Sequence, residues 1–294
     1  LGDKTIMRIG TVFPQTEAGT DPGAIREYVQ SVESLGFDHI LAFDHVLGAN
    51  ANSRPGWSGA YRHTDSFYEP LVLFGHIAGM TEKIELVTGV IILPQRQTAL
   101  VAKQAATVDL LSGGRLRLGI GIGWNPVEYE ALGEDFTTRG RRSEEQIELL
   151  RALWSEELIT YNGKYHKISD AGLNPLPPGR SIPVWFGGFS DRVLERVASM
   201  GDGWMPLGRP DNAKKTMLEK LSKLLDEQNR GIEDIGIESW ISLNDLSESE
   251  IQKDIEGWKQ LGATHLSVNT MKAGMKFPDD HVTAIEKFLQ MARS

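Results

Sequence analysis

The chain has 294 residues, of which 40% are hydrophobic and 24% are charged, and its formal net charge is −9. This composition is typical of a globular protein with a sizeable core. It does not favour nucleic acid or an anionic membrane surface as a partner, because both attract basic proteins. The absence of cysteine excludes a disulfide framework and fits a cytoplasmic protein. No apolar run approaches about 20 residues, so we expect no membrane-spanning helix.

The first half of the sequence alternates apolar runs with helical patterns. Gly89 interrupts the third apolar run, and a glycine in such a place usually marks a bulge or a close ligand. The apolar face assigned to the third helix consists of Leu100, Val101, Gln104, Ala105, Val108 and Leu111. Long stretches without periodicity are expected to be loops at 46–66 and 125–140. We predict strands at 7–13, 37–43, 84–93 and 115–123 and helices at 22–35, 67–80 and 98–111.

The second half continues the same alternation after a helix. Asn162 and Gly163 indicate the turn of a small inserted hairpin at 158–169. We predict further strands at 182–186, 201–205, 235–243 and 264–269 and helices at 141–154, 191–200, 211–230, 247–261 and 280–293. Eight alternations favour a single (β/α)8 TIM barrel domain over residues 1–294, with a doubly wound open sheet as the alternative.

Catalytic groups of such a barrel lie at the carboxyl ends of its strands. Asp44 and His45 follow the second strand, and His45 is the only histidine at a strand end beside an acid. Ionisation near neutral pH makes His45 a candidate proton donor or acceptor; the alternative is a loop histidine bonded to its neighbours. Only Asp245 offers a possible third metal ligand, so we expect no metal site.

Two glycine-rich strand ends are expected on the same face of the barrel. Gly187, Gly188 and Ser190 lie where a strand meets a helix, a place suited to a phosphate; a plain turn with a serine cap is the alternative. Trp124 follows the other glycine-rich strand, where it can stack on a planar ring or belong to the core.

Three segments, residues 37–46, 87–133 and 182–206, resemble the bacterial luciferase-like monooxygenase superfamily of flavin- and deazaflavin-dependent (β/α)8 barrels. The resemblance implies that Asp44 and His45 form an acid–histidine pair that protonates substrate or cofactor. It also implies a bulge, with a non-proline cis peptide bond, beneath the cofactor ring at Gly89 and Val90. Further positions implied to bind the cofactor are Gly121, Gly123, Trp124, Glu128, Tyr129, Gly187, Gly188 and Ser190.

The resemblance is greater to enzymes of coenzyme F420 than to those of FMN. It implies a hydride transfer to or from a small organic substrate, with His45 as acid/base oriented by Asp44 and with loops 46–66 and 125–140 around the substrate. Arg139, Arg141 and Arg142 are candidates for the anionic tail of F420; a solvated helix start is the alternative. Trp124 and Asn125 replace an acid found in sugar-phosphate enzymes, which disfavours such a substrate.

Three other functions stay open. An FMN-dependent monooxygenase would use reduced flavin and O2, and a flavin reductase or another cofactor-reducing protein would be its partner. A non-catalytic flavin-binding barrel would show no turnover. A metal-dependent isomerase suffers from the missing carboxylates. In each case we expect a homodimer or a higher homo-oligomer.

Overall fold

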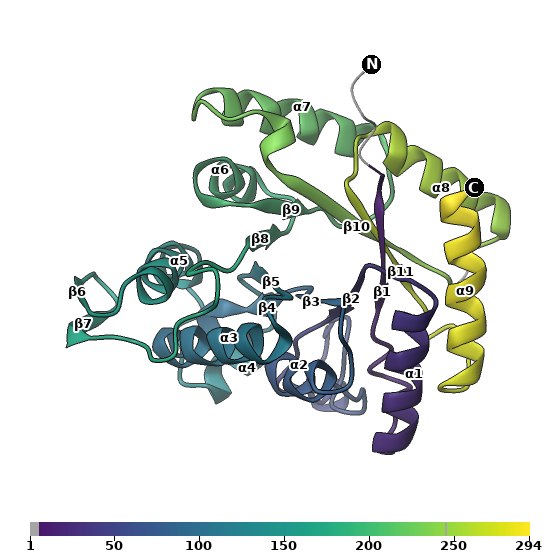
Figure 1. The fold of residues 1–294 in the computed structure, drawn as a ribbon, viewed down its shortest axis with the longest axis horizontal. Coiled ribbons are helices and arrows are strands. Elements are labelled where there is room, and N and C mark those ends of the chain that lie inside the picture. Colours follow the sequence, from purple (N-terminus) through teal and green to yellow (C-terminus); the bar gives the residue numbers. More distant parts are fainter. Residues whose placement is uncertain (1–5, 245) are drawn as a thin grey trace.

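The structure is a computed structural model that describes residues 6–244 and 246–294, and its main strands form a closed barrel (Figure 1). The barrel strands are β1 (Arg8–Val12), β2 (His39–Ala42), β3 (Glu85–Thr88), β4 (Ile91–Ile92), β5 (Leu116–Gly121), β8 (Val184–Gly187), β9 (Gly203–Met205), β10 (Gly236–Ser242) and β11 (His265–Asn269). All their pairings are parallel, and β1 pairs with both β2 and β11, which closes the sheet. The TIM barrel prediction is confirmed, and the open sheet is wrong because β1 and β11 are paired with each other.

The third barrel position is shared by β3 and β4, which both pair with β5. The bond between Gly89 and Val90 separates the two pieces and is a cis peptide bond. Gly89 packs so closely against Leu41 that a Cβ at position 89 would lie 2.2 Å from the leucine Cδ2. The sequence predicted both the interruption and the cis bond between residues 88 and 91, and the structure confirms them.

Helices cover the outside of the barrel (Figure 1). They are α1 (Pro22–Ser34), α2 (Pro70–Ala78), α3 (Thr98–Ser112), α4 (Pro126–Ala131), α5 (Arg139–Ser155), α6 (Asp191–Met200), α7 (Asn212–Asp226), α8 (Glu248–Gln260) and α9 (Asp279–Arg293), with 3-10 turns η1 (Ala51–Ser53), η2 (Leu93–Gln95) and η3 (Ile232–Asp234). Among the described residues, no helix combines the length and the apolar character needed to cross a bilayer.

One helix was missed in the sequence. The stretch 125–140 was expected to be irregular, but α4 occupies its beginning. Asn125 caps this helix by accepting a hydrogen bond from the backbone N–H of Val127 at 3.1 Å, and Pro126 occupies the first turn, where a proline is tolerated. With six residues, α4 is too short to show a helical period.

The predicted hairpin is confirmed as β6 (Ile159–Asn162) paired with β7 (Lys167–Ala171) in antiparallel fashion. Figure 1 shows it at the outer edge of the molecule, beside α5. Glu145 of α5 fixes the hairpin turn by accepting hydrogen bonds from the backbone N–H groups of residues 164, 165 and 166. The hairpin is therefore attached to α5 by side-chain bonds at its turn.

The barrel interior has a polar layer near the amino ends of the strands. Glu238 is fully buried there and accepts hydrogen bonds from Arg117 at 2.5 Å and from Ser267 at 2.8 Å, and its carboxylate lies 2.6 Å from Nε2 of His39. Burial alone would raise the pKa of Glu238, but the charge of Arg117 together with the charge and hydrogen bond of His39 holds it well below its ordinary value. Each buried charge in this layer thus has a partner, as burial requires.

Towards the carboxyl ends the interior becomes apolar. A cluster separate from the outer core fills it; its buried members are Val12, Leu41, Phe43, Val87, Trp185, Met205 and Met271. This apolar plug gives the mouth of the barrel a hydrophobic floor.

Helix α3 departs from its expected burial. Leu100 and Leu111 were assigned to the core face, yet their side chains are 52% and 62% exposed. Val101, Ala105 and Val108 are buried as predicted, and Ala102 and Ala106 join them on the core face. The prediction was wrong for the two leucines because this helix is apolar on two sides, so spacing alone does not identify the buried side.

Candidate active site at the mouth of the barrel

The chain leaves β2 and places Asp44 and His45 at the mouth, as predicted. One cavity, of about 410 Å³, lies away from the mouth and does not include His45. The cavity beside His45 has a volume of ≈ 270 Å³. Its lining residues come from the segment after β2 and are His45, Val46, Leu47, Gly48, Tyr61, Arg62, His63, Asp65 and Phe67. The loop 46–66, which the sequence assigned to a substrate pocket, thus forms most of this wall.

Asp44 does not orient His45. Its carboxylate is buried and pairs with Arg96 at 2.8 Å, and it also accepts a hydrogen bond from the backbone N–H of Ile92 at 2.9 Å. Arg96 forms a second ion pair with Glu69 at 2.7 Å. The expected orientation of His45 by Asp44 is therefore wrong: the aspartate holds the segment after the cis bond in place.

Glu128 is the partner of His45. Its Oε1 lies 3.1 Å from Nδ1 of the imidazole, and the same oxygen accepts hydrogen bonds from the backbone N–H groups of Val46 and Leu47. Gln95 donates to the other oxygen at 3.1 Å. Burial alone would raise the pKa of Glu128, but the bonds from His45 and Gln95 hold it below its ordinary value. An ionised carboxylate accepts only, so Nδ1 of His45 carries a proton.

Nε2 of His45 is left to the cavity, since none of the described residues forms a hydrogen bond with it. Aromatic rings surround the imidazole: Tyr61, Phe67 and Trp124 lie with their centroids 4.7, 4.8 and 5.7 Å away. Trp57 packs against Trp124 at 5.8 Å. These rings exclude water from three sides of the imidazole and leave one polar atom facing the cavity.

Tyr61 and Lys272 complete the rim and were not singled out in the sequence. Burial, reinforced by the charges of Asp65 and Glu17, raises the pKa of Tyr61 to about 12, so its phenol stays protonated. The ammonium of Lys272 lies 4.9 Å from the centre of the Tyr61 ring and 3.6 Å from Asp65. Lys272 follows the last barrel strand, so only the closure of the barrel brings it to this loop.

The glycines at two neighbouring strand ends make room for two side chains of the segment after the cis bond, Val90 and Ile92. A Cβ at Gly121 or at Gly187 would lie 2.6 or 2.7 Å from a methyl group of Val90, and one at Gly123 would lie 2.7 Å from Ile92. Val90 therefore lies in a notch between β5 and β8, directly above the apolar plug. An apolar floor with small residues around it fits the face of a planar ring, such as that of a flavin or a deazaflavin.

The predicted phosphate turn lies between the end of β8 and the start of α6. Gly188 has a φ of +126°, and the N-cap Ser190 makes no capping hydrogen bond, so the first N–H groups of α6 lack a side-chain acceptor. Asp191 in the first turn disfavours an anion, but Lys220 pairs with it at 2.7 Å. The N–H of Gly188 donates to the carbonyl of Met205 at 3.2 Å, so the donors left for a phosphate are the first N–H groups of α6.

Tyr129 does not face the mouth. It is fully buried, its hydroxyl donates to the carbonyl of Ile122 at 2.7 Å, and its ring packs against Phe136. This tyrosine therefore anchors α4 beneath the end of β5. We see no cofactor-facing atom in it.

The arginines proposed for a cofactor tail are largely engaged elsewhere. Arg139 donates to the carbonyl of Phe136 at 2.6 Å, and Arg142 is bonded to Glu134 and to the carbonyl of Pro94. Arg141 alone is exposed. The alternative, a solvated helix start, describes Arg141 only, because Arg139 and Arg142 are bonded within the fold.

Within residues 6–244 and 246–294 no group of three metal-binding side chains occurs, and Asp44 is already paired with Arg96. Asp245, the possible third ligand, lies outside the described residues. The candidate site at the mouth therefore consists of the imidazole of His45 and the hydrophobic floor.

Comparison with known families fits this geometry. A family model described as luciferase-like monooxygenase matches residues 7–244. The chain belongs to this family. The luciferase-like chain is 28% identical to an uncharacterized protein of Mycobacterium tuberculosis. The alignment spans 223 residues and covers 74% of this chain and 77% of that protein. It is 27% identical over 245 residues to an FMNH2-dependent dimethylsulfone monooxygenase of Pseudomonas fluorescens, covering 81% of this chain and 63% of that one.

Solved structures share the luciferase-like fold. An F420-dependent secondary alcohol dehydrogenase superposes with a TM-score of 0.78 at 18% identity, over 98% of this chain and 99% of the other. This likeness extends the barrel assignment to the whole chain. Family membership identifies the protein as an oxidoreductase of the luciferase-like monooxygenase type.

Proposed function

We propose that this luciferase-like protein binds coenzyme F420, in preference to FMN, at the mouth of the barrel and catalyses hydride transfer to or from a small organic substrate. The observation that carries the proposal is the pair formed by His45 and Glu128 beside the ≈ 270 Å³ cavity. A positioned imidazole is suited to take or give the proton of a substrate hydroxyl while a hydride passes between the substrate carbon and the cofactor.

The roles of the side chains follow from their contacts. Glu128 holds the proton on Nδ1 of His45 and so fixes the tautomer; Nε2 then gives or takes the substrate proton. The aromatic rings of Tyr61, Phe67 and Trp124 limit water around this atom. A proton held in a dry site is transferred to the substrate and not to bulk water.

Val90, Gly121 and Gly187 would hold the ring of the cofactor, and the first N–H groups of α6, which follow Ser190, would hold its phosphate. F420 transfers a hydride but does not activate O2, whereas reduced FMN can transfer a hydride and can also activate O2. The name of the F420-dependent alcohol dehydrogenase supports the first cofactor, although that neighbour shares only the fold.

A second candidate function is an FMN-dependent monooxygenase. The Pseudomonas fluorescens relative, an FMNH2-dependent enzyme, favours it. Such an enzyme would need a flavin reductase as partner. Titration of the protein with oxidised F420 and with FMN, followed by the absorption of each cofactor, separates the two candidates: tighter binding of FMN, with O2 consumption, would overturn the F420 assignment.

Replacement of His45 tests the catalytic role. In His45→Asn and His45→Ala we expect the affinity for the cofactor to stay within a few-fold, while the rate of cofactor reduction or oxidation falls by ~10²–10⁴, the usual contribution of a positioned acid or base. Stopped-flow absorption of the cofactor gives this rate. His76→Ala, at an exposed position of α2, is the matched control. Parental rates in both His45 variants would show that this histidine moves no proton.

A further inference from the structure

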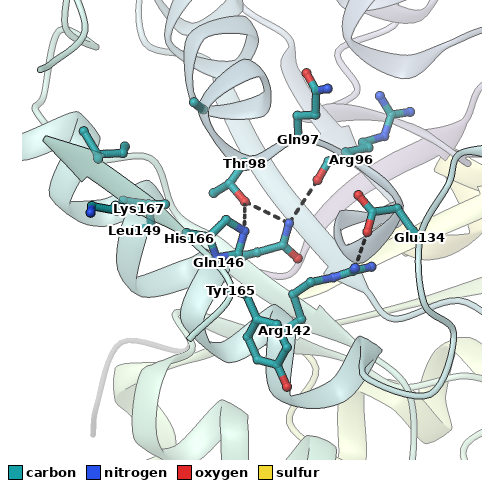
Figure 2. A pocket seen from close by; sticks show the side chains of 12 residues that line it. Arg96, Gln97, Thr98, Glu134, Arg142, Gln146, Leu149, Tyr165, His166 and Lys167 are labelled. Atoms are coloured by element: carbon teal, nitrogen blue, oxygen red, sulfur yellow. Dashed lines mark hydrogen bonds and ion pairs between the residues drawn. The ribbon is translucent and has the colours of Figure 1, made fainter. Parts of the chain in front are cut away.

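Two side chains of helix α5 hold the short turn η2 from outside the barrel. Gln146 donates from Nε2 to the carbonyl of Leu93 at 3.2 Å and to that of Arg96 at 3.1 Å, beside the ≈ 410 Å³ cavity (Figure 2). Arg142 donates to the carbonyl of Pro94, which lies between these two residues in the chain. The backbone of η2 is therefore fixed by α5 at three carbonyl groups.

The inserted hairpin supports Gln146 in this position (Figure 2). Gln146 also donates to the hydroxyl of Thr98, the first residue of α3, at 3.0 Å. Thr98 in turn bonds to Nε2 of His166 at 2.8 Å, and Glu145 lies 2.8 Å from the other ring nitrogen of His166. The NH2 group of Gln146 is therefore fully engaged, and its amide has a fixed orientation.

Turn η2 connects α5 to the mouth of the barrel. Gln95, the last residue of η2, is 4% exposed and donates from Nε2 to Oε2 of Glu128 at 3.1 Å. Oε1 of the same carboxylate lies 3.1 Å from Nδ1 of His45. A continuous chain of contacts thus runs from Gln146 through η2 and Glu128 to the imidazole.

Each oxygen of Glu128 has its own donors. Oε1 faces His45 and the backbone N–H groups of Val46 and Leu47, whereas Oε2 accepts from Gln95 alone among the described residues. A carboxylate bonded at both oxygens cannot turn about its last bond without breaking hydrogen bonds. Burial alone would raise the pKa of Glu128, and the bonds from His45 and Gln95 lower it. Gln95 therefore keeps this carboxylate ionised and directed at the imidazole.

Both glutamines act as donors only. The side-chain oxygens of Gln95 and Gln146 are buried and meet no donor within residues 6–244 and 246–294. A buried acceptor without a partner lowers stability, so an apolar side chain of the same shape would serve the fold as well. Gln15, also fully buried, differs: its amide donates to the carbonyl of Phe43 at 2.7 Å and accepts from the N–H of Tyr68 at 2.9 Å. The contrast indicates that Gln95 and Gln146 are there for the groups to which they donate.

We infer that Gln95 and Gln146 are positioning residues of the proton-transfer site. Gln146 fixes η2, and Gln95 on that turn fixes the carboxylate of Glu128 against Nδ1 of His45. Nε2 of the imidazole is thereby kept free of a proton and directed at the cavity. The inference rests on the proposed function, in which this atom exchanges a proton with the substrate.

Gln95→Met tests the inner step, because methionine has the length of glutamine but no N–H donor. The tautomer of His45 is read by ¹⁵N NMR of the cofactor-free full chain at a pH at which the imidazole is neutral, and its signals are assigned by their loss in His45→Asn. We expect the proton on Nδ1 in the parent and a partial change to the Nε2-protonated form in the variant. The rate at saturating substrate should fall about three- to tenfold, the worth of one net hydrogen bond, with KM unchanged.

Gln15→Met is the matched control, since it makes the same exchange at an equally buried glutamine. It breaks two hydrogen bonds, so its melting temperature should fall at least as far as that of Gln95→Met. Its partners do not include Glu128, and the tautomer of His45 should stay parental. The same change of tautomer in both variants would show an effect of destabilisation and would overturn the inference.

Gln146→Met tests the outer step. It removes the donor from the carbonyls of Leu93 and Arg96, so we expect a lower melting temperature and a change of tautomer in the same direction as in Gln95→Met, but smaller. Gln146→Asn, which keeps the amide on a shorter side chain, takes its place if the methionine variant does not fold. A parental tautomer in the folded variant would overturn the role of Gln146.

Failure of the inference differs from failure of the proposed function. A parental tautomer and a parental rate in Gln95→Met, beside a parent that turns over F420, would overturn the positioning role and leave the reaction in place. A parent that turns over neither F420 nor FMN would overturn the reaction, and a change of tautomer in Gln95→Met would still show that Gln95 positions Glu128.

Discussion

Glu128 shows how much one side chain can decide at the residue scale. The sequence placed it among the cofactor contacts, and that role is untested. The structure gives it a different set of partners: His45, Gln95 and two backbone N–H groups of the loop after β2. One buried carboxylate thus fixes both the tautomer of the imidazole and the start of the pocket wall.

We expect Glu128→Gln to slow the cofactor reaction by about tenfold or more, yet less than the replacement of His45. An amide can present its NH2 group to Nδ1 and so stabilise the tautomer with the proton on Nε2. The single-turnover rate measured across pH 5 to 9 checks this, and a cofactor titration serves as the control for binding. An unchanged rate at every pH would contradict a positioning role.

His265 makes folding depend on pH. Burial and then the charge of Arg117 lower its pKa to about 2, so in the folded state it stays neutral while in the unfolded chain it binds a proton near pH 6.5. The unfolded state therefore gains protons as the pH falls, and the free energy of unfolding decreases. We expect this residue to cost up to about 2 kcal/mol between pH 7 and 5. Urea unfolding of the parent and of His265→Gln checks this: the loss on acidification should be smaller in the variant.

At the scale of elements, the turn between β8 and α6 needs a test that spares folding. Valine at Gly188 does not provide one, because φ is +126° and the new Cβ would lie 3.2 Å from Val193. Replacing Ser190, the exposed N-cap of α6, with aspartate causes no such strain.

In Ser190→Asp we expect unchanged or slightly higher thermal stability, because aspartate is a good N-cap. The affinity for the cofactor should fall about tenfold or more, since the new carboxylate would lie beside the phosphate. Fluorescence titration and thermal unfolding measure the two effects. Ser247→Asp at the N-cap of α8 is the matched control. Parental affinity in Ser190→Asp would remove the phosphate from this turn.

For the whole molecule, the exposed side of α2 and α3 bears on self-association. Val72, Leu100 and Leu111 are 69%, 52% and 62% exposed on these two packed helices. We propose that a second copy of the chain covers them, because the same patch on two copies can be related by a twofold axis. The homodimer stays a prediction until it is measured.

Light scattering coupled to gel filtration should find a dimer for the parent and a monomer for Leu100→Glu with Leu111→Glu, since two desolvated charges would face the partner. Leu158→Glu, a leucine of similar exposure (64%) near the hairpin, should stay dimeric. A monomeric parent would contradict the proposal.

The sequence by itself determined the barrel, the break at Gly89 with its cis bond, the hairpin and the place of His45 at the mouth. These features depend on periodicity, on glycine and proline, and on a family pattern, all of which are local in the chain. A single domain, the site residues and the cofactor also came from the sequence and stay predictions.

The tertiary structure alone decided which groups meet. Asp44 pairs with Arg96, 52 positions away, and His45 pairs with Glu128, 83 positions away, although Asp44 and His45 are neighbours in the chain. Likewise, Lys272 reaches Tyr61 only because β11 closes the barrel against β1. Side-chain pairing depends on distances in space, and a sequence pattern records spacing along the chain. The partner of a buried charge is therefore settled only when the strands are in register.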